Sequence, residues 1–250
     1  MKAHDNSNGI ERYFRKIIAL QTEVIESQRQ KLEDAAAQMA TTIAQDGRIF
    51  IFGTGHSHMM AEEAFYRAGG LAPVVPIFSS ALMLHEKPNF SSRLERTGGL
   101  AEVLLGEYHV RPGEMILIFS NSGVNRLPVE MALKAKDSGL FVVTVSSLAY
   151  ARMAPLSSLG KRLDEAADIA IDNCGEPGDA LVQIQETDWH VGPSSTISGA
   201  LIWNCLVTEC VERLHASGVA LPVFASFNMP GAAEHNAELL EKWRMYNPHL

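Results

Sequence analysis

Five short apolar runs constrain the fold of this sequence more than any other feature. Each run is nearly continuous in apolar residues rather than alternating with polar ones, which is typical of strands buried on both faces. Helical patterns separate several of the runs, and strands that alternate with helices predict a parallel sheet with right-handed crossovers. We therefore expect an α/β fold, a three-layer sandwich of about five parallel strands with helices on both faces. The expected strands are Arg48–Phe52, Pro73–Phe78, Met115–Phe119, Phe141–Ser146 and Asp168–Ile171.

The helices of the α/β domain are expected between and after these strands. One pattern of helical period covers Ser57–Ala68, and a second covers Arg126–Ser138 with Gly139 as its C-cap. The third, Ser195–Ala216, follows the last expected strand.

The first part of the chain, residues 1–45, is also helical by pattern. Its apolar residues, from Ile10 to Ile43, recur with a spacing of about 3.6. A single helix over this stretch would be about 50 Å long, more than a compact domain can cover. The helix is therefore either broken or packed on a second subunit. Because the apolar stripe persists over many turns, we favour a homodimer or a higher homo-oligomer.

The rest of the chain reads as one domain with an extension. No linker, internal repeat or low-complexity tract interrupts residues 46–217. Residues 218–250 carry Pro222, Pro230 and Pro248 around one short helical pattern, Ala232–Tyr246. We expect this extension to lie over the domain rather than to form a second one.

Composition excludes several classes of function. The net charge of −8 argues against a nucleic-acid partner, which would need a basic face. The longest apolar runs have the length of a strand, so we expect no membrane segment. The N-terminus lacks the apolar stretch of a signal peptide, and the three cysteines form no CxxC pair. We therefore expect a cytoplasmic protein without disulfides or a structural zinc site.

Three turns before helices are rich in glycine and short polar side chains. In an open parallel sheet, ligands bind beyond the carboxyl ends of the strands. The turn Gly53–His58 has two glycines, which allow a close approach of the backbone to a ligand. The turn Ser120–Asn125 holds more hydrogen-bonding side chains than one N-cap needs, and Gly192–Thr196 brings three hydroxyls to one helix start.

Taken singly, each turn is also explained by a tight bend and ordinary capping. Taken together, they indicate a phosphate and the hydroxyls of a sugar, because free N–H groups at helix N-termini attract anions. No lysine or arginine lies within the turns, so neutral donors and helix dipoles would hold the ligand. The candidate ligand-binding residues are Gly53, Thr54, Gly55, His56, Ser57, Ser120, Asn121, Ser122, Gly123, Asn125, Ser194, Ser195 and Thr196.

Other phosphate and nucleophile motifs do not fit. A dinucleotide site needs a third glycine where this chain has His58, and an acid at the end of the second strand, which ends at Phe78. The sequence contains neither a P-loop nor a G-x-S-x-G nucleophile turn. We expect no cofactor.

Together, the first glycine turn, the Ser-Asn-Ser-Gly turn and the helix after Thr196 resemble the sugar isomerase (SIS) domain over about Leu32 to Leu214. The stretch Phe52–Leu71 and several shorter motifs are more similar to a bacterial SIS subfamily without an assigned reaction, described as phosphosugar isomerases or phosphosugar-binding proteins. The resemblance implies a three-layer, Rossmann-like α/β fold, a sugar-phosphate ligand, and a dimer or larger oligomer. The shorter motifs are Leu84-His85-Glu86, Ser91–Glu95, Gly192–Thr196 and Glu234-His235-Asn236.

Isomerisation of a sugar phosphate needs a base beside the carbonyl, and an acid or second base. Related SIS enzymes have a catalytic His or Glu in the loop that holds His85 and Glu86, so the resemblance indicates Glu86 as the base. Phosphoheptose isomerases carry a functional glutamate in an Ala-Glu-Glu similar to the one that contains Glu63, at a different spacing. His235 in the extension is a further candidate, because the tail could close over a site. For each, an ordinary surface residue is the alternative.

A zinc site would have to combine His56 and His58 with His85, His190 or Cys174, and we assign no metal. We expect a phosphosugar-binding protein that catalyses aldose–ketose isomerisation or related proton abstraction. A non-catalytic phosphosugar sensor is the alternative, as is an etherase, deaminase or deglycase acting on a phosphosugar.

Overall fold

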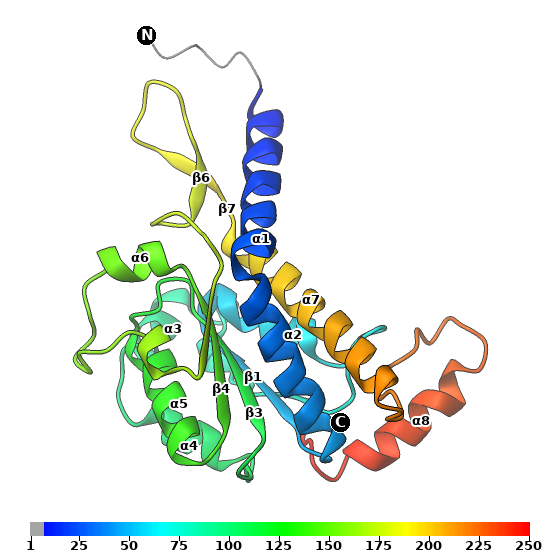
Figure 1. The fold of residues 1–250 in the computed structure, drawn as a ribbon. Coiled ribbons are helices and arrows are strands. Elements are labelled where there is room, and N and C mark those ends of the chain that lie inside the picture. The colour runs from blue at the N-terminus through cyan, green and yellow to red at the C-terminus, as the bar shows by residue number, and fades with distance from the viewer. Residues whose placement is uncertain (1–7) are drawn as a thin grey trace.

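The computed structural model describes residues 8–250 and has a five-stranded parallel sheet at its centre (Figure 1). The strand order is β2-β1-β3-β4-β5, so the chain reverses its direction of travel across the sheet between β1 and β3. This confirms the predicted fold class. The strands are β1 (Ile49–Gly53), β2 (Val74–Pro76), β3 (Met115–Phe119), β4 (Phe141–Ser146) and β5 (Ile169–Asp172).

Helices cover both faces of the sheet. On one face, α1 (Gly9–Ala44) and α7 (Ser195–Ala216) lie side by side, with the short α2 (Met59–Ala64) near them (Figure 1). On the other face lie α4 (Leu100–Gly106) and α5 (Arg126–Asp137).

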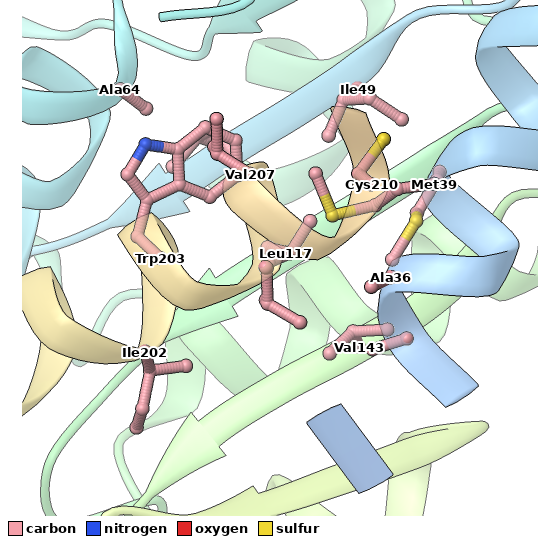
Figure 2. Close-up of a cluster of buried hydrophobic side chains, with 14 of the residues drawn as sticks. Ala36, Met39, Ile49, Ala64, Leu117, Val143, Ile202, Trp203, Val207 and Cys210 are labelled. Carbon is pink, nitrogen blue, oxygen red and sulfur yellow. The ribbon is translucent and has the colours of Figure 1, made fainter. Parts of the chain in front are cut away.

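The apolar side chains of the strands point alternately into these two layers. Figure 2 shows the core on the α1–α7 face, where Trp203 and Cys210 of α7 pack among Met39, Ile49 and Leu117. Burial raises the pKa of the Cys210 thiol to about 12, so this cysteine is an inert core residue.

Helix α1 is a single unbroken helix of 36 residues, so it spans about 54 Å. Its C-terminal half covers the sheet, and its N-terminal half extends past the domain beside a hairpin of two antiparallel strands (Figure 1). The strands are β6 (Ala180–Gln183) and β7 (His190–Pro193), and Leu181 and Val182 pack against Ile17 and Leu20. The structure excludes a broken helix, but it also supplies a partner for α1 within the chain, which the sequence reading missed.

Several predicted elements have different bounds in the structure. The helix predicted over Ser57–Ala68 is a 3₁₀ turn, Gly55–His58, followed by the short α2, which ends at Ala64 because Phe65 is extended. The last helix, α8 (Ala232–Trp243), is shorter than predicted. The short helices α3 (Pro88–Leu94) and α6 (Leu148–Met153), together with α4, were not predicted. Their residues are too few for a clear period.

The C-terminal extension lies at the edge where the strands begin. Its backbone pairs with residues 69–72, and the carbonyl of Tyr246 accepts a hydrogen bond of 2.9 Å from Nη1 of Arg48. Arg48 precedes β1 and forms a buried, bidentate ion pair with Glu114, which precedes β3, at 2.6 and 2.8 Å. Although burial raises the pKa of Glu114, hydrogen bonds from Arg48 and Arg111 outweigh it and lower the pKa below the usual value.

Candidate functional site

The three predicted turns meet at one cavity at the edge where the strands end. Its volume is about 10 Å³, or about 280 Å³ when the open solvent at its mouth is counted. The turn after β1, the turn after β3 and the start of α7 each contribute two polar residues. Met60, Phe119, Val145 and Gly199 provide apolar lining. The polar lining residues are His56, Ser57, Ser120, Asn121, Ser195, Thr196 and Asn173.

The first turn is held close to the start of α2 by its glycines. A Cβ atom on Gly53 would lie 2.2 Å from the carbonyl oxygen of Ser57, so no larger residue fits the observed turn. Gly55 has a φ of +58°, the left-handed region that favours glycine. This conformation turns the chain sharply and brings His56 and Ser57 to the cavity.

Several polar groups of the cavity have no partner in the described chain. The hydroxyls of Ser57, Ser120 and Thr196 form no hydrogen bond within residues 8–250. Asn121 accepts a hydrogen bond of 2.9 Å from Asn173, which follows β5, and this leaves its amide nitrogen without a partner among the described residues. The cavity therefore offers neutral donors to a ligand. Asn173 had not been predicted, because a single asparagine after a strand carries no motif.

The third turn is organised by Asp179, which the sequence reading also missed. Its carboxylate accepts hydrogen bonds from the backbone N–H groups of Ser194 and Ser195, at 3.1 and 2.8 Å. It also accepts from both hydroxyls, at 3.0 and 2.7 Å. Asp179 therefore caps the N-terminus of α7 with a negative charge. Ser194 is fully buried, and of the three predicted hydroxyls that of Thr196 alone is unpaired within residues 8–250.

The second turn divides its residues between two cavities. Ser120 and Asn121 line the one just described, whereas Ser122 and Asn125 line a neighbouring cleft of about 450 Å³. Arg96 and Arg126 line the same cleft, which we call the arginine cleft. Gly123, between the two pairs, has a φ of +61°, and a Cβ atom there would lie 3.2 Å from Cβ of Ser146.

The predicted catalytic residues do not line either cavity. His85 and Glu86 are exposed in the loop before α3. Glu63 forms an ion pair with Arg67 and accepts a hydrogen bond of 3.3 Å from Asn204 on α7. His235 lies on α8, where its Nε2 is 2.8 Å from the carbonyl oxygen of Val223. Within a single chain, the predicted ligand-binding turns therefore meet at the cavity, but the four predicted catalytic side chains do not reach it.

Glu95 is a carboxylate near the turns that the prediction did not single out. It follows α3, and its side chain is 17% exposed. Its Oε1 accepts a hydrogen bond of 2.6 Å from Thr54 in the first turn, and its carbonyl oxygen accepts one of 2.9 Å from the backbone of Leu127 in α5. The Ser91–Glu95 motif was the signal that could have found it.

His58 is buried beneath the first turn. Its ring stacks on Phe78 at 5.4 Å, and Nε2 lies 3.4 Å from the backbone nitrogen of Ser79. Burial lowers the pKa of His58, and the nearby Glu62 carboxylate partly opposes this effect. Within residues 8–250, no group of three or more His, Cys, Asp and Glu side chains is placed to hold a metal ion. No helix there is long and apolar enough to cross a membrane.

Comparison with known sequences gives a consistent result. A model of the SIS domain family matches residues 12–147. A UPF0309 protein of Brucella abortus is 39% identical over 240 residues, and one of Listeria monocytogenes is 38% identical over 242. Each alignment covers 96% of this chain and 98% of the relative.

Similar solved structures include phosphoheptose isomerases. The enzyme from Francisella tularensis superposes with a TM-score of 0.55 at 14% identity, over 85% of this chain and 100% of the other. The one from Neisseria gonorrhoeae gives 0.53 at 16% identity, over 83% and 97%. The Vibrio vulnificus NanR protein, complexed with ManNAc-6P, gives 0.50 at 11% identity, over 94% and 70%. At these identities the likeness shows the fold.

Proposed function

Because this chain belongs to the SIS domain family, together with the UPF0309 proteins, we propose that it binds a phosphorylated sugar where its three polar turns meet. The observation that carries the proposal is the convergence of Ser57, Ser120 and Thr196, whose hydroxyls have no partner within residues 8–250, on one cavity. Phosphoheptose isomerases and a complex with ManNAc-6P among the structural neighbours support the ligand class.

The chemistry of the cavity suits this ligand. Neutral hydroxyl and amide donors can surround phosphate oxygens and sugar hydroxyls. The first turn of α7 lies at this cavity, whereas Asn125 and Arg126 at the start of α5 line the arginine cleft. Asp179 already occupies the backbone N–H groups at the very start of α7, so Thr196 is the donor that we expect from that helix.

We propose that the reaction is aldose–ketose isomerisation. A base removes the proton from the carbon beside the carbonyl, giving an enediol, and the proton returns to the neighbouring carbon. We propose Glu86 as the base with His85 as its partner, and Glu63 and His235 as further candidates that would act if the loop or a second subunit brings them to the cavity. Glu95 is an additional candidate, because it already contacts the first turn through Thr54.

A sensor without catalysis is the second candidate function. It is favoured by one observation: none of the four predicted catalytic side chains lines the cavity of a single chain. Elimination or deamination of an amino-sugar phosphate would use the same base with a different leaving group, so it remains a variant of the catalytic proposal.

We also propose a cytoplasmic homodimer. The exposed face of the N-terminal half of α1 carries Ile10, Phe14 and Ile18, which are 84%, 60% and 50% exposed. Trp189 at the hairpin tip is 76% exposed. Apolar residues repeated along one helix face mark a protein interface more often than solvent, and a second copy of α1 offers the same stripe.

A thermal-shift screen tests the binding proposal. Phosphosugars should raise the melting temperature, because a ligand that binds only the folded state stabilises it, whereas the unphosphorylated sugars should not. Replacing Ser120 by Ala, or Thr196 by Val, should reduce the shift; the exposed Ser217, at the far end of α7, provides the control Ser217→Ala. Equal shifts with unphosphorylated sugars would rule out a phosphate site.

Proton exchange in deuterated water then separates the enzyme from the sensor. A bound phosphosugar should take up deuterium at the carbon beside its carbonyl, and Glu86→Gln and Glu95→Gln should show which carboxylate is the base. A ligand that binds tightly but never exchanges would favour the sensor.

A further inference from the structure

The arginine cleft is the larger of the two cavities at this edge of the sheet. Its volume of about 450 Å³ lies within the range of small-molecule sites. Two arginines from different parts of the chain line it: Arg96 follows α3, and Arg126 begins α5. The hydroxyl-lined cavity on the other side of the turn is lined by no lysine or arginine. The two cavities therefore differ in charge.

Several polar groups of the arginine cleft lack a partner. Asn125 is the N-cap residue of α5, but its side chain does not cap the helix. The hydroxyls of Ser122 and Tyr150 form no hydrogen bond within residues 8–250. The Nε atom of Arg126 is buried and likewise unpaired there. A buried donor without a partner is costly, and Nε of Arg126 is such a donor, whereas Ser122, Asn125 and Tyr150 are half-buried and can bind solvent or a ligand.

The positive charge of the cleft is only loosely neutralised. The guanidinium of Arg126 lies 3.9 Å from Glu130, whose carboxylate already accepts two hydrogen bonds, at 2.9 and 3.1 Å, from the backbone of Gly99. That of Arg96 lies 3.8 Å from Glu95, which is bonded to Thr54. Nη1 of Arg126 donates a hydrogen bond of 2.7 Å to Oγ of Ser158, and Nη1 of Arg96 donates one of 2.5 Å to the carbonyl oxygen of Ser92. Nη2 of each arginine has no hydrogen-bond partner within residues 8–250 and can bind another anion.

We propose that the arginine cleft is a second anion subsite, which takes a second acidic group of the phosphosugar. The proposal rests on the proposed function of the neighbouring cavity. A ligand lying over the Ser120–Asn125 turn would place its phosphate among the hydroxyls of Ser120 and Thr196. Its other end, a carboxylate or a second phosphate, would receive charge-assisted hydrogen bonds from Arg96 and Arg126. The protein thus selects phosphosugars with two anionic groups over those with one.

The experiment compares pairs of probes that differ in one anionic group. Calorimetry measures the Kd of 6-phosphogluconate against glucose 6-phosphate, and of fructose 1,6-bisphosphate against fructose 6-phosphate. In each pair, the wild-type protein should bind the doubly anionic probe at least about tenfold more tightly. Arg96→Gln and Arg126→Gln should reduce this preference to near unity, with little change for the singly anionic probes.

Control variants distinguish loss of the proposed subsite from a general loss of stability and from loss of binding at the first cavity. Arg93→Gln, three residues before Arg96 but outside the cleft, should keep the full preference. Ser120→Ala should weaken the binding of all four probes and leave the preference for the doubly anionic probes intact. If the Arg126→Gln protein does not fold, Arg126→Lys can replace it in this test, because it keeps the positive charge but removes the guanidinium.

Four results would overturn the proposal. Equal Kd values within each pair, or a preference that survives both arginine substitutions, would do so while leaving the proposed function standing. Stabilisation by sulfate that depends on Arg126 and adds to that of glucose 6-phosphate would mean that the cleft holds a separate ion. Failure of every phosphosugar to bind would remove the proposed function itself, and the subsite with it.

Discussion

The hydroxyl of Thr54 donates a hydrogen bond of 2.6 Å to Oε1 of Glu95, across 41 positions in the chain. Thr54 is buried in the first polar turn, and Glu95 follows α3. Since the backbone of Glu95 also binds α5 at Leu127, this pair connects the turn after β1 to the helix after β3. The carboxylate of Glu95 therefore links the first turn to α5, in addition to the pairing of β1 with β3 that ends at Gly53 and Phe119.

Replacing Thr54 by Val should break this connection. A hydrogen bond to a charged group contributes about 1.5–3 kcal/mol, so we expect the free energy of unfolding to fall by about 2 kcal/mol. Phosphosugar affinity should fall too, because the turns lose their common anchor. Denaturant unfolding and calorimetry measure the two effects. Thr54→Ser keeps the hydroxyl and should restore most of both; equal losses in the two variants would contradict a role for the hydrogen bond.

Removing the charge of Glu114 should destabilise the protein strongly. Glu114→Gln leaves the buried Arg48 with backbone carbonyl acceptors but no carboxylate, and loss of one member of a buried ion pair costs about 3–5 kcal/mol. Urea unfolding measures the loss. Arg111→Gln removes a more exposed contact to the same carboxylate and should cost less than about 1 kcal/mol. A small effect of Glu114→Gln would show that solvent reaches Arg48.

Stability should decrease in mild acid because of His58. Burial lowers its pKa in the folded state, so the unfolded chain takes up the proton first. The stabilisation is complete above the unfolded pKa, about 6.5, and is lost as the pH falls below it. Burial lowers the pKa of His249 as well, with the same sign.

Unfolding free energies measured at pH 7.5 and pH 5.5 test this prediction. His58→Gln should lose less stability over this interval than the wild type does. The exposed His215 provides the control, and His215→Gln should lose as much unfolding free energy between pH 7.5 and pH 5.5 as the wild type does. If all three proteins lost the same unfolding free energy over this interval, His58 would not be the source of the acid destabilisation.

Gly53 should tolerate no side chain. A Cβ atom 2.2 Å from the backbone oxygen of Ser57 forces the turn to move, so Gly53→Ala should cost at least about 2 kcal/mol and abolish phosphosugar binding. Gly106 ends α4 in open space, and Gly106→Ala should be neutral or stabilising by up to about 1 kcal/mol. Melting temperatures and thermal shifts measured on both variants compare them directly.

The α1 stripe should control oligomerisation. Phe14→Glu places a charge in the proposed interface and should convert a dimer to a monomer, as measured by sedimentation equilibrium. Met245→Glu changes a residue that is 85% exposed in the C-terminal extension and should leave the mass unchanged. A wild-type monomer at all concentrations would refute the proposed dimer.

The central strands and the longest helices could be read from the sequence because their apolar runs are local and continuous. β3, β4 and α7 have the predicted bounds. The β6–β7 hairpin could not be read in this way. Its residues carry a weak alternation, and their apolar side chains are buried by α1, more than 150 positions away in the chain.

The polar turns were determined by the sequence alone, since glycines and short hydroxyl side chains before helices are local signals. Only the tertiary structure decided how they are used. Strand order brings Ser57, Ser120 and Thr196 to one cavity, and the same turn gives Ser122 and Asn125 to the arginine cleft. In the folded chain, Asp179 caps the N-terminus of α7, and Glu95 accepts a hydrogen bond from Thr54. Such pairings depend on long-range packing, which no local pattern of residues encodes.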